Sequence, residues 1–150
     1  MAFMPVIISG GAGSRLWPLS RDTCPKPFVE MPEGGTLIGR AYSRVARLEG
    51  VERIVTVTNR DFLFLTADVY QAAAAPAVDN TFLLEPVGRD TAAAVALAAL
   101  HVATAHGGET VLLVSPADHL IRDEDAFAAA VRRAVELAQQ GRIVTFGIEP

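Results

Sequence analysis

The chain has 150 residues, of which 51% are hydrophobic, and a formal net charge of −4. That length fits one domain, expected to span residues 1–150, and such a domain buries about 68–70% of the surface of its unfolded chain. The acidic balance argues against binding to nucleic acid, which usually requires a basic face, but a few local cations suffice to hold one phosphorylated small molecule.

Several features of the sequence favour a soluble, cytoplasmic protein. Cys24 is the only cysteine, which excludes an intrachain disulfide and favours a reducing compartment. The N-terminus lacks the positively charged segment and the long apolar core of a signal peptide. The most apolar tract, residues 92–105, is shorter than the roughly 18 residues of a membrane span. We therefore expect a buried helix there and no membrane partner.

In the first half of the chain, short apolar runs alternate with helical patterns. They predict, in order, a strand at residues 6–9, a helix at 37–48, a strand at 53–57, a helix at 60–73 and a strand at 81–84. Leu37, Ala41 and Val45 fall on one face of the first helix, and Gly50 is placed to end it. Asn59 is the expected N-cap of the second helix.

The second half continues the alternation. It predicts a helix at residues 91–105, a strand at 111–114, a helix from 124 to 140 and a fifth strand at 143–146. Asp90 is the expected N-cap of the first of these helices. Asp123 and Glu124 open the next helix, where acidic side chains suit the positive end of the helix dipole.

This order of elements predicts an α/β fold. The strands are too uniformly apolar for a sheet with one wet face, so we expect a Rossmann-like three-layer α/β/α arrangement around a mainly parallel sheet. Ligands of such sheets bind beyond the carboxyl ends of the strands. Polar residues follow three predicted strands, at Gly10, at residues 85–90 and at residues 115–119, and we expect them to meet at one edge.

The loop after the first strand, "GGAGSRLWPLSRDTCPKPF", matches neither common phosphate fingerprint. Ser14 stands where a Walker motif requires lysine, and Leu16 stands where the dinucleotide motif requires glycine. Glycines nevertheless let backbone amides approach phosphate oxygens, while Arg15 and Lys26 add positive charge. Prolines on both sides of Lys26 restrict its backbone. The loop therefore predicts a polyphosphate site.

These residues resemble a family. The loop is similar to the signature GGxGxRLxPxS…PK of sugar-1-phosphate nucleotidyltransferases, and "LWPLSR" resembles the mannose-1-phosphate guanylyltransferases among them. "LLEPVGRDTAAAVALAAL" and "SPADHLI" are similar to later motifs, in matching order, so that the resemblance spans nearly the whole chain. It implies a nucleotide-diphospho-sugar transferase fold of the GT-A type, of which this chain would be the N-terminal, nucleotide-binding portion, truncated at residue 150.

The resemblance also implies residue roles. Arg15 and Lys26 match the catalytic pair that polarises the triphosphate. Asp118, which follows the fourth predicted strand, matches an aspartate that holds Mg²⁺, the implied cofactor; its partner carboxylate would lie beyond residue 150. The implied substrate-binding residues are Gly10, Gly11, Gly13, Ser14, Arg21, Glu85, Gly88, Arg89 and Thr91.

Glu85 makes a specific prediction about the base. In related uridylyl- and thymidylyltransferases the resemblance implies glutamine at this place. Guanine presents N1–H and N2–H₂ donors along one edge, and a carboxylate only accepts, so a glutamate complements guanine. The alternative is an exposed glutamate at a strand end with no role in binding.

The implied reaction forms GDP-mannose and pyrophosphate from GTP and α-D-mannose 1-phosphate, by in-line attack on the alpha phosphorus. Three alternatives stay open: a GTP-binding module with no activity of its own, a nucleotidyltransferase that uses another sugar or base, and an α/β scaffold or interaction protein whose loops have no role in binding. The expected partners are GTP and a sugar 1-phosphate. The sequence does not fix the oligomeric state, and a homo-oligomer is one option.

Overall fold

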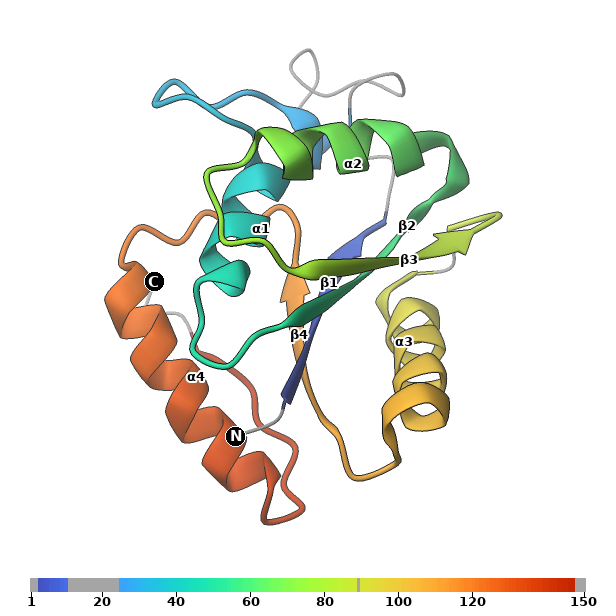
Figure 1. The fold of residues 1–150 in the computed structure, drawn as a ribbon, viewed down its shortest axis with the longest axis vertical. Coiled ribbons are helices and arrows are strands. Elements are labelled where there is room, and N and C mark those ends of the chain that lie inside the picture. Colours follow the sequence, from blue (N-terminus) through green and yellow to red (C-terminus); the bar gives the residue numbers. More distant parts are fainter. Residues whose placement is uncertain (1–2, 11–24, 89, 148–150) are drawn as a thin grey trace.

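A computed structural model describes residues 3–10, 25–88 and 90–147 of the chain (Figure 1). In chain order its elements are β1 (Phe3–Ser9), the short 3-10 helix η2 (Lys26–Phe28), α1 (Leu37–Ala46), β2 (Arg53–Asn59), the 3-10 helix η3 (Arg60–Phe62), α2 (Leu63–Ala72), β3 (Asp79–Glu85), α3 (Asp90–His106), β4 (Val111–Pro116) and α4 (Glu124–Ala138). Four of the five predicted strands and all four predicted helices are confirmed.

The strands form one parallel sheet in the order β3-β2-β1-β4. Parallel pairing requires a crossover between strands, and the helices supply it. Helices α1, α2 and α4 lie on one face of the sheet and α3 covers the other, which Figure 1 shows as separate layers. The predicted α/β/α architecture is therefore confirmed.

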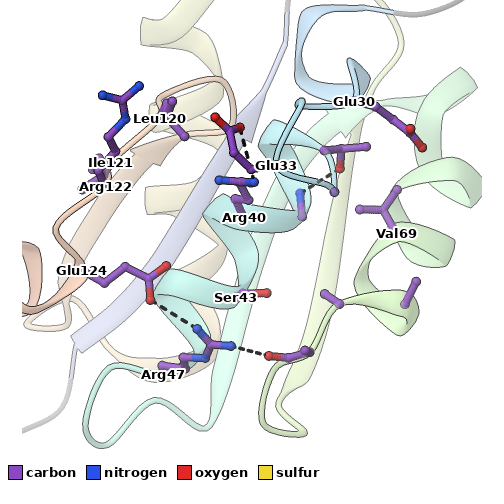
Figure 2. Close-up of a pocket in the computed structure, with 16 residues that line it drawn as sticks. Glu30, Glu33, Arg40, Ser43, Arg47, Val69, Leu120, Ile121, Arg122 and Glu124 are labelled. Carbon is purple, nitrogen blue, oxygen red and sulfur yellow. Dashed lines mark hydrogen bonds and ion pairs between the residues drawn. The ribbon is translucent and has the colours of Figure 1, made fainter.

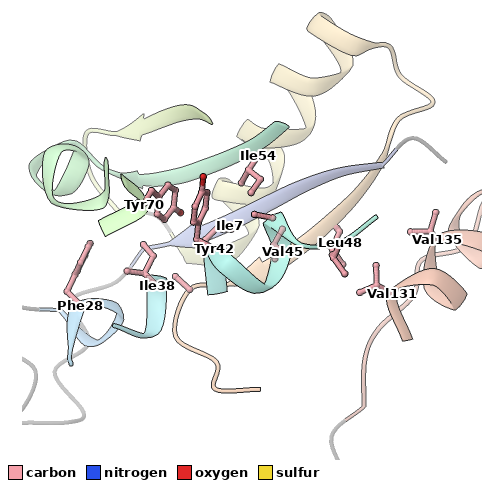
Figure 3. Packing of buried hydrophobic residues seen from close by; sticks show 13 residues of the cluster. Ile7, Phe28, Ile38, Tyr42, Val45, Leu48, Ile54, Tyr70, Val131 and Val135 are labelled. Atoms are coloured by element: carbon pink, nitrogen blue, oxygen red, sulfur yellow. The ribbon is translucent and has the colours of Figure 1, made fainter. Parts of the chain in front are cut away.

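Alternating side chains of the strands build two separate cores. The larger one joins Ile7 and Ile54 to α1 and α2, where the rings of Tyr42 and Tyr70 stack with centroids 3.9 Å apart (Figure 3). Burial raises the pKa of the Tyr70 phenol well above its usual range, and its hydroxyl lies 3.0 Å from the hydroxyl oxygen of Thr56. The smaller core packs side chains from the opposite face of the sheet, among them Val6, Val55 and Val57, against small residues of α3, namely Ala94, Ala98 and Val102.

Two helix caps follow the sequence prediction and one differs from it. Asn59 Oδ1 accepts a hydrogen bond of 3.0 Å from the backbone N–H of Asp61 and opens η3, which continues into α2. Asp123 caps α4 in the same way, by accepting from Ala126 N–H at 2.8 Å. Asp90 instead is the first residue of α3 and has a φ of 61°, in the left-handed region rather than the extended region of an ordinary cap.

The predicted fifth strand is wrong. Residues 142–147 have no regular secondary structure, and Ile143 is 98% exposed. The β-branched run has the composition of a strand, but a strand requires a hydrogen-bonded neighbour. Within the described residues β4 pairs with β1 alone. None of the described helices is long and apolar enough to cross a membrane.

One buried cation sets up a test of stability. Arg44 of α1 is 2% exposed, and its guanidinium lies 5.2 Å from the ring centroid of Phe127 of α4. No described residue is hydrogen-bonded to Nε, Nη1 or Nη2. Burial lowers the pKa of Arg44, and the nearby charge of Glu124 opposes that shift only in part. The guanidinium is therefore a buried charge without full compensation.

We expect Arg44→Met to raise the free energy of unfolding by about 1 kcal/mol, because methionine fills the volume under Phe127 without a desolvation cost. Urea denaturation measures it. Arg47→Met is the matched control on the same helix. Arg47 is half exposed and donates to Glu124 at 3.2 Å and to the Ala74 carbonyl at 2.7 Å, so its removal should leave stability unchanged or lower it. A clear loss of stability in Arg44→Met would contradict the prediction.

Candidate functional site

A cavity of about 510 Å³ opens at the carboxyl ends of β1, β2 and β3, beside the start of α3. This is the place where ligands bind to parallel α/β sheets. Its lining residues are Ile8, Ser9, Gly10, Pro25, Pro27, Phe28, Asn59, Asp61, Phe62, Glu85, Gly88, Asp90, Thr91 and Ala94. Four predicted substrate-binding residues, Gly10, Glu85, Gly88 and Thr91, therefore line one cavity although 81 positions separate the first from the last.

The alternation of side chains along the strands explains why Gly10, Asn59 and Glu85 lie at the same cavity. Val6 and Ile8 of β1, Val57 of β2 and Leu83 of β3 all pack into the core beneath α3. Side chains two residues further along each strand lie on the same face. Continuing the pattern therefore brings Gly10, Asn59 and Glu85 to that face, at the point where the core ends and the cavity begins.

Glu85 is not the exposed strand-end residue of the alternative prediction. It is 7% exposed and is paired in register with Asn59 on the neighbouring strand. A Cβ atom placed on Gly10 would lie 3.3 Å from Glu85 Oε2, closer than most such contacts. The absence of a side chain at residue 10 thus leaves room for the carboxylate. Because little water reaches this buried carboxylate, a ligand that offers a pair of N–H donors would form strong hydrogen bonds with it.

Lys26 and Asp118 form an ion pair beside the cavity. Lys26 Nζ lies 2.8 Å from Asp118 Oδ2, across 92 positions of sequence, and each side chain is about one-third exposed. Lys26 is in η2, directly after Pro25, and Asp118 follows β4. A partly exposed pair of this kind contributes at most about 1 kcal/mol, so an anionic ligand and a cation can separate the two groups.

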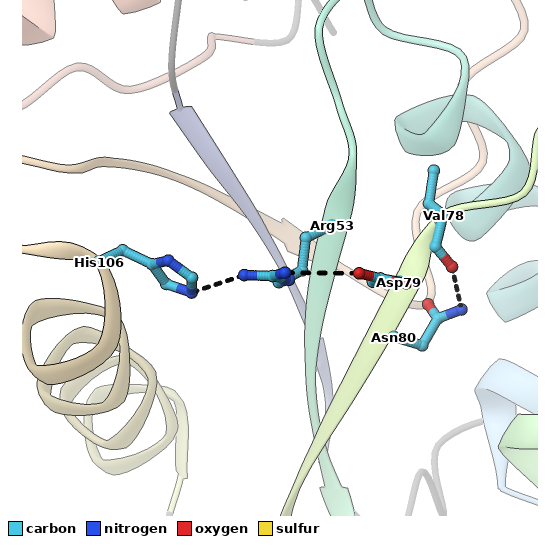
Figure 4. Close-up of polar contacts among 5 residues, drawn as sticks. All are labelled: Arg53, Val78, Asp79, Asn80 and His106. Carbon is cyan, nitrogen blue, oxygen red and sulfur yellow. Dashed lines mark hydrogen bonds and ion pairs between the residues drawn. The ribbon is translucent and has the colours of Figure 1, made fainter.

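His119 is the histidine nearest to this pair, with Nε2 4.0 Å from Asp118 Oδ1, and it is half exposed. No site role is predicted for it from the sequence. His106 lies at the far end of the sheet, where Arg53 Nη1 is 3.3 Å from its Nε2 and Arg53 Nη2 is 3.4 Å from Asp79 Oδ2 (Figure 4). That cluster is at the amino ends of β2 and β3, remote from the cavity.

Six predicted site residues lie outside the described residues: Gly11, Gly13, Ser14, Arg15, Arg21 and Arg89. Their roles stay predictions. Among the residues that the structure describes, no group of three or more histidine, cysteine or carboxylate side chains could hold a metal ion. Asp118 offers a single carboxylate. That donor fits Mg²⁺, which is commonly held by one or two carboxylates together with substrate phosphates and water.

Sequence reasoning missed part of the cavity wall. Phe28 and Phe62 line it and pack against each other with centroids 5.5 Å apart. Asn59 and Asp61 line it as well, although Asn59 was predicted only as a helix cap. The available signal was the same one that located Glu85, because Asn59 also ends an apolar strand of a parallel sheet.

A larger cavity, of about 720 Å³, lies between α1, α2 and the loop that precedes α4 (Figure 2). Its size does not make it the better candidate. Several of its charged groups already satisfy one another: Arg47 donates to Glu124, and Arg40 Nη2 donates to the Gly34 carbonyl at 2.8 Å and lies 3.7 Å from Glu33. No predicted site residue lines it.

The sheet defines an α/β protein with a cavity at the carboxyl ends of its strands, and comparison with known proteins identifies the family. The profile of the nucleotidyl transferase family matches residues 4–150, so the chain belongs to that family. It is 46% identical over 147 residues to the xanthan biosynthesis protein XanB of Xanthomonas campestris pv. campestris strain B100, covering 98% of this chain and 31% of the relative.

Two further proteins are similar to the chain over almost all of its length. The chain is 45% identical over 151 residues to mannose-1-phosphate guanylyltransferase RfbM of Salmonella typhimurium, covering all of this chain and 31% of that protein. The crystal structure of a protein from Thermus thermophilus, titled mannose-1-phosphate geranyltransferase, superposes with a TM-score of 0.76 at 38% identity, over 94% of this chain and 39% of that one. The chain thus spans about a third of the length of these relatives.

Proposed function

We propose that this chain belongs to a mannose-1-phosphate guanylyltransferase and binds the GTP that this enzyme converts, with α-D-mannose 1-phosphate, into GDP-mannose and pyrophosphate. The observation that carries the proposal is the shared cavity of Gly10, Glu85, Gly88 and Thr91, with the Lys26–Asp118 pair beside it. Family membership supports the reaction class, and the names of the relatives support mannose 1-phosphate as the second substrate.

Glu85 supports guanine as the base. Its two carboxylate oxygens accept from the N1–H and N2–H₂ donors of one guanine edge, and its burial makes an unmatched partner costly. Adenine offers no such pair of donors. The rings of Phe28 and Phe62 give the same cavity an apolar wall against which a base can pack.

In the proposed reaction, an oxygen of the sugar phosphate attacks the alpha phosphorus of GTP. A new P–O bond forms, the bond between the alpha phosphorus and the bridging oxygen breaks, and pyrophosphate leaves with that electron pair. The nucleophile is already anionic, so no general base is required. Lys26 contributes positive charge to the oxygens on which negative charge develops. Arg15 is proposed for the same task from the resemblance alone.

Asp118 is the residue that would hold Mg²⁺ in this proposal. When bound, the ion would neutralise charge on the phosphate oxygens. The carboxylate of Asp118 is accessible at one edge of the sheet and is held 2.8 Å from Lys26, so that the two groups face the same space. Lys26 in turn keeps the carboxylate oriented until substrate arrives.

The direct test is release of pyrophosphate from mannose 1-phosphate with GTP, UTP and dTTP supplied in parallel. We expect release with GTP and at least tenfold less with the two pyrimidine nucleotides. Equal release with all three would contradict guanine recognition, and release with a pyrimidine nucleotide alone would favour the alternative of another base.

A second candidate function is favoured by the coverage of the relatives, since the chain spans about 31% of their length. It is a GTP-binding module that requires further chain for turnover. Thermal denaturation separates this candidate from a protein without a nucleotide site. GTP at 100 times its Kd would raise the stability by about 2.7 kcal/mol whether or not turnover occurs.

A further inference from the structure

Asn59 occupies a position in the cavity that its role as a helix cap does not explain. Its backbone ends β2, in register with Glu85 at the end of β3, and both residues line the cavity. Partners in register on parallel strands carry their side chains on the same face, about 4.8 Å apart across the sheet. An amide and a carboxylate therefore lie next to each other along one wall.

The cap hydrogen bond fixes the direction of this amide. Asn59 Oδ1 accepts from the backbone N–H of Asp61 at 3.0 Å. The carbonyl end is thereby occupied, and the other end of the amide is Nδ2, which carries two N–H donors. Within the described part of the chain no residue accepts a hydrogen bond from Nδ2. The amide therefore presents donors where its neighbour Glu85 presents acceptors.

Guanine displays the complementary order of groups. Along one edge it carries the N2–H₂ donor, the N1–H donor and the O6 acceptor, and O6 is adjacent to N1–H. A carboxylate can satisfy the two donors but repels O6. A complete match to this edge requires a carboxylate and, beside it, an N–H donor. Adenine reverses the order at these positions, because it has an amino donor in place of O6.

We propose that Asn59 is a second specificity-determining residue, which donates from Nδ2 to O6 of guanine while Glu85 accepts from N1–H and N2–H₂. The inference rests on the proposed function, since it assigns a further contact within the same nucleotide site. Asp61 acts through Asn59, because its backbone N–H holds the amide in the donating orientation. An amide held in this orientation discriminates against a 6-amino purine, because the Nδ2 donors of Asn59 would then face the 6-amino donor of the base and neither group would have an acceptor.

Asn59→Asp is the variant that separates the two roles of this side chain. A carboxylate still accepts from the Asp61 N–H, so the cap on η3 is kept, but it no longer donates. An acceptor then faces O6. The probes are GTP, 6-thio-GTP, in which sulfur replaces O6 and accepts weakly, and inosine triphosphate, which keeps O6 and N1–H but lacks the 2-amino group.

Calorimetric titration of the purified protein with each probe gives the affinities. For the unaltered chain we expect 6-thio-GTP to bind about tenfold more weakly than GTP. In Asn59→Asp we expect GTP affinity to fall at least tenfold and the ratio between GTP and 6-thio-GTP to approach one. The ratio between GTP and inosine triphosphate, which reports on Glu85, stays as before. Glu85→Gln is the matched control, since it should change the ratio of affinities between GTP and inosine triphosphate and leave the ratio between GTP and 6-thio-GTP unchanged.

The outcomes distinguish this inference from the function on which it rests. If the unaltered chain binds none of the three probes, the proposed function fails. If it binds GTP and Asn59→Asp keeps the preference for GTP over 6-thio-GTP, the assignment of Asn59 is overturned while the nucleotide site stands. The negative charge added by Asn59→Asp lowers the affinity for all three nucleotides alike, so the ratios between their affinities remain diagnostic. Melting temperatures of the variant and the unaltered chain check that the cap is preserved.

Discussion

Replacing Lys26 by alanine is expected to lower kcat for pyrophosphate release by about a hundredfold or more, with a change in GTP affinity below about tenfold. The ammonium group would act chiefly on charge that develops as the alpha phosphorus is attacked, and groups of that kind lower the activation barrier by roughly 2.7–4 kcal/mol. In the proposed site, ground-state binding of GTP would be shared with backbone donors and other cations. Steady-state kinetics and an independent GTP titration separate the two quantities.

The composition of the chain offers a direct probe of the same residue. Lys26 is the only lysine among 150 residues, whereas every other basic side chain of fixed charge is an arginine. In a 150-residue polypeptide of this sequence, an amine-selective acylating reagent should therefore label only Lys26 and the N-terminal amine. GTP should protect Lys26 and leave the N-terminus reactive, which makes the terminus an internal control.

Lys26→Arg tests whether charge alone suffices. A guanidinium keeps the positive charge but has a planar, larger donor group, and Pro25 and Pro27 hold the backbone of η2 in place. We expect partial recovery relative to Lys26→Ala. Equal losses in kcat/KM and in GTP affinity for the alanine variant, with kcat unchanged, would mean that Lys26 only binds the ground state.

Asp118→Asn is expected to reduce turnover by about a hundredfold and to raise the Mg²⁺ concentration needed for half-maximal GTP binding. Asparagine has nearly the same shape, but its amide lacks the negative charge that attracts a divalent cation. The substitution also removes the ion pair that orients Lys26 at 2.8 Å. Titrating GTP binding at several Mg²⁺ concentrations measures the effect without turnover.

Asp123→Asn supplies the control for this experiment. It removes the same charge five positions away, at the start of α4, and asparagine caps a helix as well as aspartate does. Turnover and Mg²⁺ dependence should both be unchanged in this variant. A Mg²⁺ dependence of GTP binding that is identical in Asp118→Asn and in the unaltered chain would remove Asp118 from the metal site.

Most of the fold could be predicted because each strand is a short apolar run between recognisable ends. Asn59 and Asp123 mark helix starts by local chemistry, and the structure confirms both as caps, whereas α1 ends at Ala46, with Arg47 as its C-cap, before it reaches Gly50. The parallel sheet followed from strands that are apolar on both faces. Residues 143–146 have the same composition, and the prediction failed there because pairing depends on a neighbouring strand rather than on the segment itself.

The candidate site was predictable where a motif or a strand end pointed to it. Glu85, Gly88 and Thr91 come from one motif and line one cavity. Phe62 and Asp61 could not be found in this way, because their place in the cavity wall depends on how η3 turns after β2. The pairing of Lys26 with Asp118 also depends on tertiary structure, since β1 and β4 become neighbours only in the folded sheet.

The sheet order has a consequence for how the nucleotide preference of such a protein can change. Glu85 ends β3 and Asp118 follows β4, and these strands form opposite borders of the sheet, with β2 and β1 between them. In the proposed site, recognition of the base and binding of the phosphates would thus depend on residues at opposite borders of the sheet. Substitutions near the end of β3 could change which nucleotide is preferred and leave the residues around Asp118 in place.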